Sequence, residues 1–241
     1  LTAEQYRQFN IHRGLDHGAL VPLYFINKKA SGFSIVHLSV ADFSNLDLYR
    51  FGESIKESIG RVEGRFVFIA SGDLSHKFSH ESPYGYSPKG PEFDELLMRL
   101  LKEGDIEQLV AMDPKLCREA AECGMKSFLM MLGANDGTHL KTEIISHEGP
   151  FGIGYGVVSL TPSGTSDGPK LMDRILNDKK REAQERRSAC DAYVNLAIRS
   201  LEHYLLEGCP MPLKDAIAKG LVPEELLKEQ AGAFVSIKKH G

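Results

Sequence analysis

The sequence lacks any long apolar stretch and any pattern of a secretory leader. No run of about eighteen apolar residues occurs in the 241-residue chain, so no transmembrane helix is expected. The first twenty residues carry Glu4, Arg7, Arg13 and Asp16, which are incompatible with the apolar region of a signal peptide. We therefore expect a cytoplasmic protein.

An excess of positive charge is also absent. The formal net charge is -4 and the sequence pI is about 6.2. Such a balance disfavours nucleic acids and anionic membranes as partners and leaves small molecules or proteins. With 42% hydrophobic and 26% charged residues, the composition is that of an ordinary globular protein of one large or two small domains.

Cysteine is scarce, and its spacing excludes the common cysteine frameworks. The chain contains four cysteines, Cys117, Cys123, Cys190 and Cys209, and none of them forms a CxxC pair. A disulfide framework or a zinc ribbon is therefore not expected, and the thiols are predicted to be reduced.

The apolar residues that are present predict alternating strands and helices. Strands are expected at 33–40, 65–70, 140–146 and 154–160, and helices at 46–61, 93–102, 114–123 and 125–132. Alternation of this kind favours a layered α/β domain. The last two strands follow one another without a helix, which indicates an antiparallel hairpin. The predicted fold is therefore α/β, with a central mixed sheet flanked by helices.

The composition changes abruptly after residue 161. Proline, serine and glycine crowd together over 162–169, as is typical of a linker, and a charge-dense helix pattern follows over 171–187. An apolar stripe from Tyr193 to Leu205, closed by Gly208, predicts the first helix of a second, α+β domain. The expected organisation is a first domain over 1–161, a linker and connector helix over 162–188, and part of a second domain over 189–241.

Both ends of the sequence suggest a fragment. The chain opens at Leu1, and it stops at Gly241 shortly after 234–237, an alternating stretch typical of a strand with no partner following it. We therefore expect that the sequence is truncated at both ends.

The first candidate for chemistry is His17, in the tripeptide Asp16-His17-Gly18. A histidine held by Asp16 or by a backbone carbonyl could point its other ring nitrogen at a ligand. A loop histidine with satisfied hydrogen bonds is the alternative.

The second candidate is His76, at the end of Ser71-Gly72-Asp73-Leu74-Ser75-His76, directly after the predicted strand 65–70. Ligands of open α/β sheets bind at the carboxyl ends of strands, where an imidazole can act as a general acid or base. Asp73 could orient His76 or cap a following helix. His80 could pair with His76 on a metal, although the Gly- and Pro-rich stretch that follows disfavours a continuous helix.

The third candidate is the pair Glu122 and Cys123, before Gly124. A carboxylate suits iron(II), whereas a thiolate suits a softer ion. A core cysteine and a solvated carboxylate are the alternatives. Of the remaining histidines, His37 is expected in the core of a strand and His147 in a turn.

In this order, the motifs resemble those of class III (LigB-like) extradiol ring-cleavage dioxygenases and their Memo-like relatives. They are Asp16-His17-Gly18 leading to Val21-Pro22-Leu23, the stretch from Ser71 to His76, and Glu122-Cys123-Gly124. The resemblance covers approximately residues 1–160. The later stretches 191–206, 221–227 and 231–236 are similar to the opening of an AMMECR domain, a fusion typical of the proteins called AmmeMemoRadiSam system protein A.

The resemblance implies a non-haem Fe(2+) site that holds a catechol-type aromatic and O2. It implies His76 as the acid/base group, and His17 with Asp73 at the substrate. The metal ligand of this region falls at Glu122 or Cys123, and the two histidine ligands are expected upstream of this chain. In Memo-like relatives the ligand is a cysteine, which favours copper or another soft metal.

Three functions are therefore open. The first is oxidative ring cleavage of a catechol-type aromatic. The second is a Memo-like metal- or redox-binding module that acts with a radical-SAM protein partner, and the third is a metal-free scaffold. A homo-oligomer is an open alternative for each.

Overall fold

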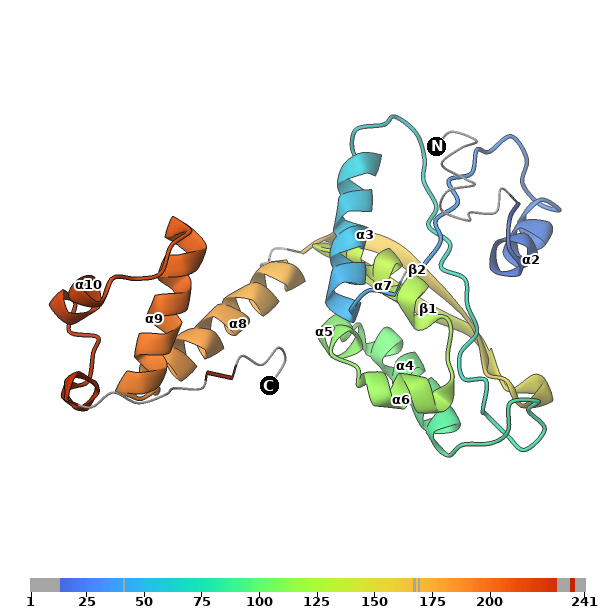
Figure 1. Cartoon of the computed structure of the whole chain (residues 1–241). Coiled ribbons are helices and arrows are strands. Elements are labelled where there is room, and N and C mark those ends of the chain that lie inside the picture. The colour runs from blue at the N-terminus through green and yellow to red at the C-terminus, as the bar shows by residue number, and fades with distance from the viewer. Residues whose placement is uncertain (1–13, 41, 167, 169, 229–234, 237–241) are drawn as a thin grey trace. The chain divides into compact units, whose positions relative to one another are not determined.

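The structure is a computed structural model that describes residues 14–40, 42–166, 168, 170–228 and 235–236. The chain divides into two compact units, Leu1–Met172 and Asp173–Gly241, and each is described by itself (Figure 1). Within the described ranges, no helix combines the length and the apolar character needed to cross a membrane.

The first unit combines short helices with one β-hairpin (Figure 1). In chain order its elements are α2 (His17–Ile26), α3 (Asn45–Ile59), α4 (Lys89–Glu103), α5 (Ile106–Val110), α6 (Pro114–Ala120), α7 (Met125–Gly133), β1 (Thr138–Glu148), η1 (Pro150–Gly152) and β2 (Tyr155–Thr165). The predicted helices at 46–61, 93–102, 114–123 and 125–132 correspond to α3, α4, α6 and α7. Helix α2, which was not among the predicted helices, begins at His17 because Asp16 caps its first turn.

Helices α3 and α7 make the closest helix contact of this unit. A Cβ atom at Gly52 would lie 2.2 Å from the carbonyl oxygen of Met130, and one at Gly133 would lie 2.0 Å from that of Tyr49. Glycine is therefore required on both helices for the backbones to approach this closely. The buried Tyr49 hydroxyl donates a hydrogen bond to Asp136 Oδ1 over 2.7 Å, which fastens α3 to the end of α7.

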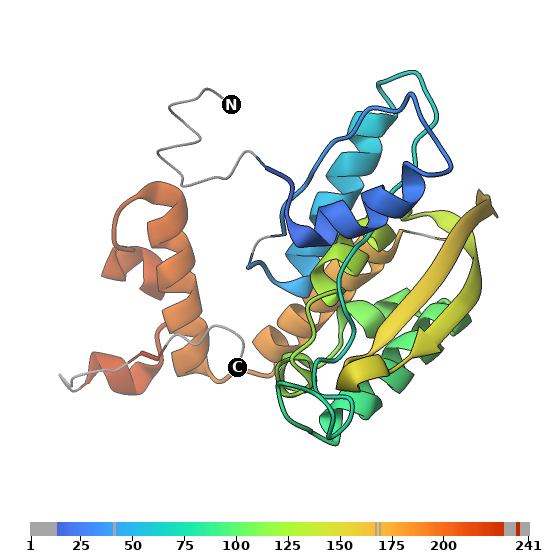
Figure 2. The same ribbon diagram turned by 90° about the vertical axis from the view of Figure 1, so that its right-hand side faces the viewer.

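Strands β1 and β2 form the predicted antiparallel hairpin. Their register runs from Thr138 opposite Thr165 to Glu148 opposite Tyr155, and η1 closes the turn. Helix α4 packs against β1, so one face of the hairpin is covered by the helical layer (Figure 2). The α/β class is confirmed.

The sheet differs from the predicted one in the number of its strands. Segments 33–40 and 65–70 are extended but form no ladder, so within the described residues the sheet has two antiparallel strands and is not mixed. Val36 and Val67 in these segments are 84% and 85% exposed. β-Branched residues favour extended backbone, but a strand also needs a partner for its N–H and C=O groups, and no described segment provides one.

The second unit, from Asp173 onward, is helical. It contains most of α8 (Leu171–Ser188), followed by α9 (Ala192–Glu207), α10 (Leu213–Ala218) and η2 (Glu224–Leu227). Arg187 of α8 forms an ion pair with Glu202 of α9. The predicted C-cap Gly208 is confirmed by its left-handed φ of 72°. Residues 234 and 237 of the predicted final strand lie outside the described residues, and the domain boundaries at 161/162 and 188/189 stay predictions.

Candidate acid–base and metal site

The segment that carries Asp73 and His76 is held by backbone hydrogen bonds on both sides. Leu74 N donates to Gly154 O over 2.9 Å, and Gly154 N donates to Ser75 O over 2.7 Å. His76 N donates to Ala120 O, at the end of α6, over 3.1 Å. Leu74 and Ser75 are buried, so the segment is fixed although it is neither a helix nor a strand.

The turn between α6 and α7 brings Cys123 to the same place. Ala121 adopts a left-handed conformation that ends α6, and Glu122 Oε2 accepts a hydrogen bond from Met125 N over 2.7 Å at the start of α7. Gly124 N then donates to Asp73 O over 3.0 Å. The turn is thereby tied directly to the segment that carries His76.

Three side chains from these two segments converge. His76 Nε2 lies 3.1 Å from Asp73 Oδ2 and 3.9 Å from Cys123 Sγ, and Asp73 N donates to Cys123 Sγ over 3.2 Å. One ligand atom of each residue lies within 4.8 Å of the other two, and no other group of three such residues meets this criterion in the described part of the chain. Carboxylate, imidazole and thiolate are all metal ligands, so the group is a candidate metal site.

Burial at the turn between α6 and α7 favours the neutral forms of Cys123 and Glu122. Cys123 is exposed, yet desolvation of its thiolate raises the thiol pKa, against the lowering effect of the Asp73 N–H. Burial likewise raises the pKa of Glu122, which the hydrogen bond from Met125 partly offsets. A bound cation would favour the thiolate, because a metal competes directly with the thiol proton.

Two tyrosines at the site were missed by the sequence analysis. The Tyr84 ring lies over His76, with the ring centroids 5.1 Å apart. Desolvation raises the pKa of Tyr155, and the charges of Asp73 and Cys123 add to that effect. Neither tyrosine belongs to a local motif, and only the hairpin and the loop at 79–88 bring them near His76.

The structure brings some of the predicted site residues together and leaves others apart. Asp73, His76 and Cys123 come together, and Asp73 orients His76 rather than capping a helix, because no helix follows it. Glu122 directs a carboxylate oxygen at the backbone of α7 and is not one of the three converging residues. His80 contacts the ring of Tyr86, with centroids 4.4 Å apart, and is likewise outside the group.

His17 lies on the exposed first turn of α2 and is not part of the converging group. Asp16 does not hold His17: its Oδ1 accepts the N–H of Ala19 over 2.9 Å and lies 3.8 Å from His37 Nε2. His37 is therefore a partly exposed partner of a carboxylate and not a core histidine. Helix α2 is still connected to the site, because Ser71, two residues before Asp73, donates a hydrogen bond from its Oγ to Gly18 O over 2.6 Å.

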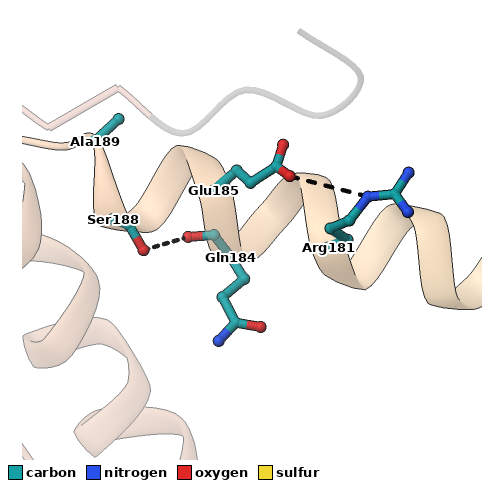
Figure 3. A pocket seen from close by; sticks show the side chains of 5 residues that line it. All are labelled: Arg181, Gln184, Glu185, Ser188 and Ala189. Atoms are coloured by element: carbon teal, nitrogen blue, oxygen red, sulfur yellow. Dashed lines mark hydrogen bonds and ion pairs between the residues drawn. The ribbon is translucent and has the colours of Figure 1, made fainter.

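The second unit has a shallow hollow along one side of α8, and it offers no comparable chemistry. Its lining residues are Arg181, Gln184, Glu185, Ser188 and Ala189 (Figure 3). The polar groups are engaged along the helix itself, because Arg181 pairs with Glu185 and Ser188 Oγ donates to the carbonyl of Gln184. The lining carries no imidazole or thiol.

Comparison with known families decides the relationship of the first unit. Residues 4–158 match the family described as the catalytic LigB subunit of aromatic ring-opening dioxygenase. The chain belongs to the LigB family. All three converging residues lie within the matched range.

Three curated relatives of this LigB chain are informative. It is 40% identical to Protein CA_C1420 of Clostridium acetobutylicum over 243 residues, which span 100% of this chain and 50% of the relative. It is 30% identical to a 3,4-dihydroxyphenylacetate 2,3-dioxygenase of Escherichia coli over 130 residues, 49% of this chain and 46% of that protein. It is 28% identical to the beta subunit of a 2-aminophenol 1,6-dioxygenase of Pseudomonas sp over 117 residues, 44% of this chain and 38% of that subunit. The chain thus spans half or less of the length of each of these relatives.

The donor set of this LigB chain fits a metal ion. The resemblance implies iron bound by two imidazoles and a carboxylate, whereas the converging group offers one imidazole, one carboxylate and one thiolate. Thiolate and imidazole suit ions softer than those preferred by an all-oxygen site. The residues present therefore fit a transition metal, and Cys123 shifts the preference toward a softer one.

Proposed function

We propose that this chain supplies the acid–base and metal-binding groups of an extradiol-type dioxygenase that cleaves a catechol-type aromatic with O2. The observation that carries the proposal is the convergence of Asp73, His76 and Cys123. The relatives named as dioxygenases of 3,4-dihydroxyphenylacetate and 2-aminophenol support the reaction class, since both compounds carry adjacent hydroxyl or amino groups on one aromatic ring.

In this proposal His76 is the acid/base residue. Its Nε2 is bonded to Asp73 Oδ2, so in the neutral ring Nδ1 is the atom that can accept a proton from a substrate hydroxyl. Asp73 stabilises the resulting imidazolium, because an adjacent carboxylate favours the charged form of the ring. The ring of Tyr84 limits how far the imidazole can rotate.

Cys123 is the proposed metal ligand from this chain, joined by the carboxylate of Asp73, with Glu122 as the alternative carboxylate. Bound Fe(2+) would supply the one-electron and O2 chemistry of the reaction. His17 is proposed to contact the substrate, through the connection that Ser71 makes between α2 and the site.

The experiment is ring cleavage by the iron-loaded protein with 3,4-dihydroxyphenylacetate as the probe. His76→Ala should lower kcat by about 10²–10⁴, as is usual for loss of a general acid or base. His80→Ala is the matched control, because His80 lies four residues away and outside the group. A His76→Ala variant as active as the parent would contradict the assignment.

A second function is favoured by one feature, the thiol of Cys123 within the group. We propose as the alternative a Memo-like module that binds copper or another soft metal and acts with a radical-SAM partner, without ring cleavage. The distinguishing result is copper binding that Cys123→Ser removes, in a protein that gives no turnover with catechols. Iron binding with turnover would reject this alternative.

The domain layout is part of the proposal. We assign 1–161 to the LigB/Memo-like domain, 162–188 to a linker and connector helix, and 189–241 to the N-terminal part of an AMMECR-like domain. A cytoplasmic location and a homo-oligomeric state complete it. Limited proteolysis tests the layout, because residues 162–165 are paired in β2 and cleavage should therefore concentrate in the following glycine- and proline-containing stretch 166–169.

A further inference from the structure

Asp94 is a fully buried carboxylate directly beneath the segment that carries His76. It lies on α4 with 0% of its surface exposed, and its Oδ1 accepts a hydrogen bond from Ser75 N over 2.8 Å. Its Oδ2 lies 3.6 Å from Nε2 of His147 on β1. Both residues were missed by the sequence analysis, which expected His147 in a turn and gave Asp94 no role.

The surroundings leave this carboxylate no room to move. A Cβ atom at Gly154 would lie 1.7 Å from Asp94 Oδ2, so only glycine allows the backbone to cover the carboxylate there. Gly154 is also the residue that pairs with Leu74 and Ser75. Asp94 and Gly154 therefore hold the same two residues from two directions.

Stability alone does not explain a carboxylate at this position. Burial raises the pKa of Asp94, which the hydrogen bond from Ser75 and the nearby His147 partly offset. Among the described residues Oδ2 makes no close hydrogen bond, since its ion-pair partner His147 Nε2 lies 3.6 Å away, and the Ser75 hydroxyl is also buried without a hydrogen bond. A buried charge of this kind costs free energy, and an apolar residue of similar volume would often give an equally stable fold.

Ser75, whose backbone N–H donates to Asp94, is one residue before His76 and two residues after Asp73. Because His76 N is bonded to Ala120 O, fixing Ser75 between Asp94 and Gly154 leaves the backbone of this segment no freedom to shift away from Cys123. The ring of His147 packs in turn edge-on to Phe78, with centroids 6.3 Å apart, at the far end of the same segment.

We propose that Asp94, with His147 as its partner, is a positioning residue that holds Asp73 and His76 against Cys123. The inference rests on the proposed function, because it assigns Asp94 a role through the group that would bind metal. Asp94 touches neither substrate nor metal in this role. It acts through the backbone N–H of Ser75.

The first measurement is the affinity of the protein for Co(2+), followed by the absorption band of a cobalt thiolate. Asp94→Leu removes both acceptor oxygens and should weaken cobalt binding by about 10–100-fold, as is typical when a supporting partner of a metal site is lost. Asp94→Asn keeps an acceptor for Ser75 N–H, so it should recover most of that loss. Recovery by this conservative variant separates positioning by a hydrogen bond from a general effect on folding.

Asp136→Leu is the matched control. Asp136 is also buried and accepts hydrogen bonds from the Tyr49 hydroxyl and from Leu171 N, but it is not bonded to the 73–76 segment. It should lower the melting temperature and leave cobalt affinity unchanged. If Asp94→Leu does not fold, His147→Phe removes only the imidazole partner and should weaken binding by about tenfold.

The second measurement does not depend on metal. The ring-proton resonances of His76, which lies against Tyr84, should shift in metal-free Asp94→Leu and stay in place in Asp136→Leu. A parent that binds no cobalt would reject the proposed metal site, and the His76 resonances would then decide the positioning role alone. Unchanged resonances in Asp94→Leu, or cobalt affinity equal to that of the parent, would overturn the inference.

Discussion

Two neighbouring stretches of irregular backbone have opposite environments. In 73–78, Leu74 is 3% exposed and the backbone is bonded to Gly152, Gly154 and Ala120. In 65–70, Val67 is 85% exposed and no backbone hydrogen bond joins the segment to another described residue. The more apolar of the two stretches is thus the less buried. Burial here follows hydrogen-bond partners and not apolar content alone.

The largest contrast should appear in the free energy of unfolding, between helix α4, which is bonded to 73–78 through Asp94, and the segment 65–70. Phe93 on α4 is 0% exposed, whereas Phe66 is 49% exposed. Phe93→Ala should therefore cost about 3–5 kcal/mol, because it leaves a cavity in the packed region. Phe66→Ala should cost no more than about 1 kcal/mol, because the half-exposed Phe66 side chain buries less apolar surface on folding. Urea unfolding of both variants measures the difference, and equal losses would mean that 65–70 is packed in solution.

A smaller difference in stability is expected when a methyl group is added at Gly154, which is bonded to 73–78, and at Gly18, on the exposed helix α2. Gly154→Ala forces a methyl group against Asp94 and should destabilise the protein by about 1–3 kcal/mol. At Gly18 on the exposed helix α2, a Cβ atom meets Asp16 Oδ1 at 3.6 Å, an ordinary contact. Gly18→Ala should be neutral or up to about 1 kcal/mol stabilising, because alanine favours the helix. Thermal unfolding compares the two, and a tolerated Gly154→Ala would show that the 73–78 region can relax.

The smallest effect should lie in the pH dependence of stability. Burial raises the pKa of Asp94 above its ordinary value of 3.8, so the folded protein binds this proton more tightly than the unfolded chain. The contribution of Asp94 to the free energy of unfolding therefore falls as the pH rises from 3.8 through the raised pKa. Asp94→Asn should remove that decline.

The pKa of the exposed Asp42 shifts in the opposite direction. A hydrogen bond from Lys126 lowers the pKa of Asp42. The contribution of Asp42 to the free energy of unfolding is therefore present above pH 3.8 and is lost as the pH falls through the lowered pKa. The side chain is 98% exposed, and solvent screens the pair, so Asp42→Asn should leave the profile nearly unchanged. Urea midpoints over about pH 2–7 check both variants. If Asp94→Asn and the parent protein showed the same dependence of stability on pH, the raised pKa assigned to Asp94 would be contradicted.

Much of the fold and part of the site were predictable because their causes are local. Helical spacing of apolar residues predicted α3, α4 and α7, and consecutive strands without an intervening helix predicted the β1–β2 hairpin. His76 and Cys123 were identified because short motifs carry them. Asp94 and Tyr155 were not, because a buried aspartate on a helix and a strand tyrosine have no distinctive neighbours in sequence.

The sequence by itself determined helices α3, α4, α6 and α7, the β1–β2 hairpin, the Asp16 and Gly208 caps and the residue types available for chemistry, since these depend on spacing and on contacts within a few residues. Tertiary structure decided which of those residues meet. It placed Cys123 beside His76, turned Glu122 toward the backbone of α7, and set Asp94 under Ser75. These outcomes depend on long-range backbone pairing, such as that of Ser75 with Gly154, which no local pattern specifies.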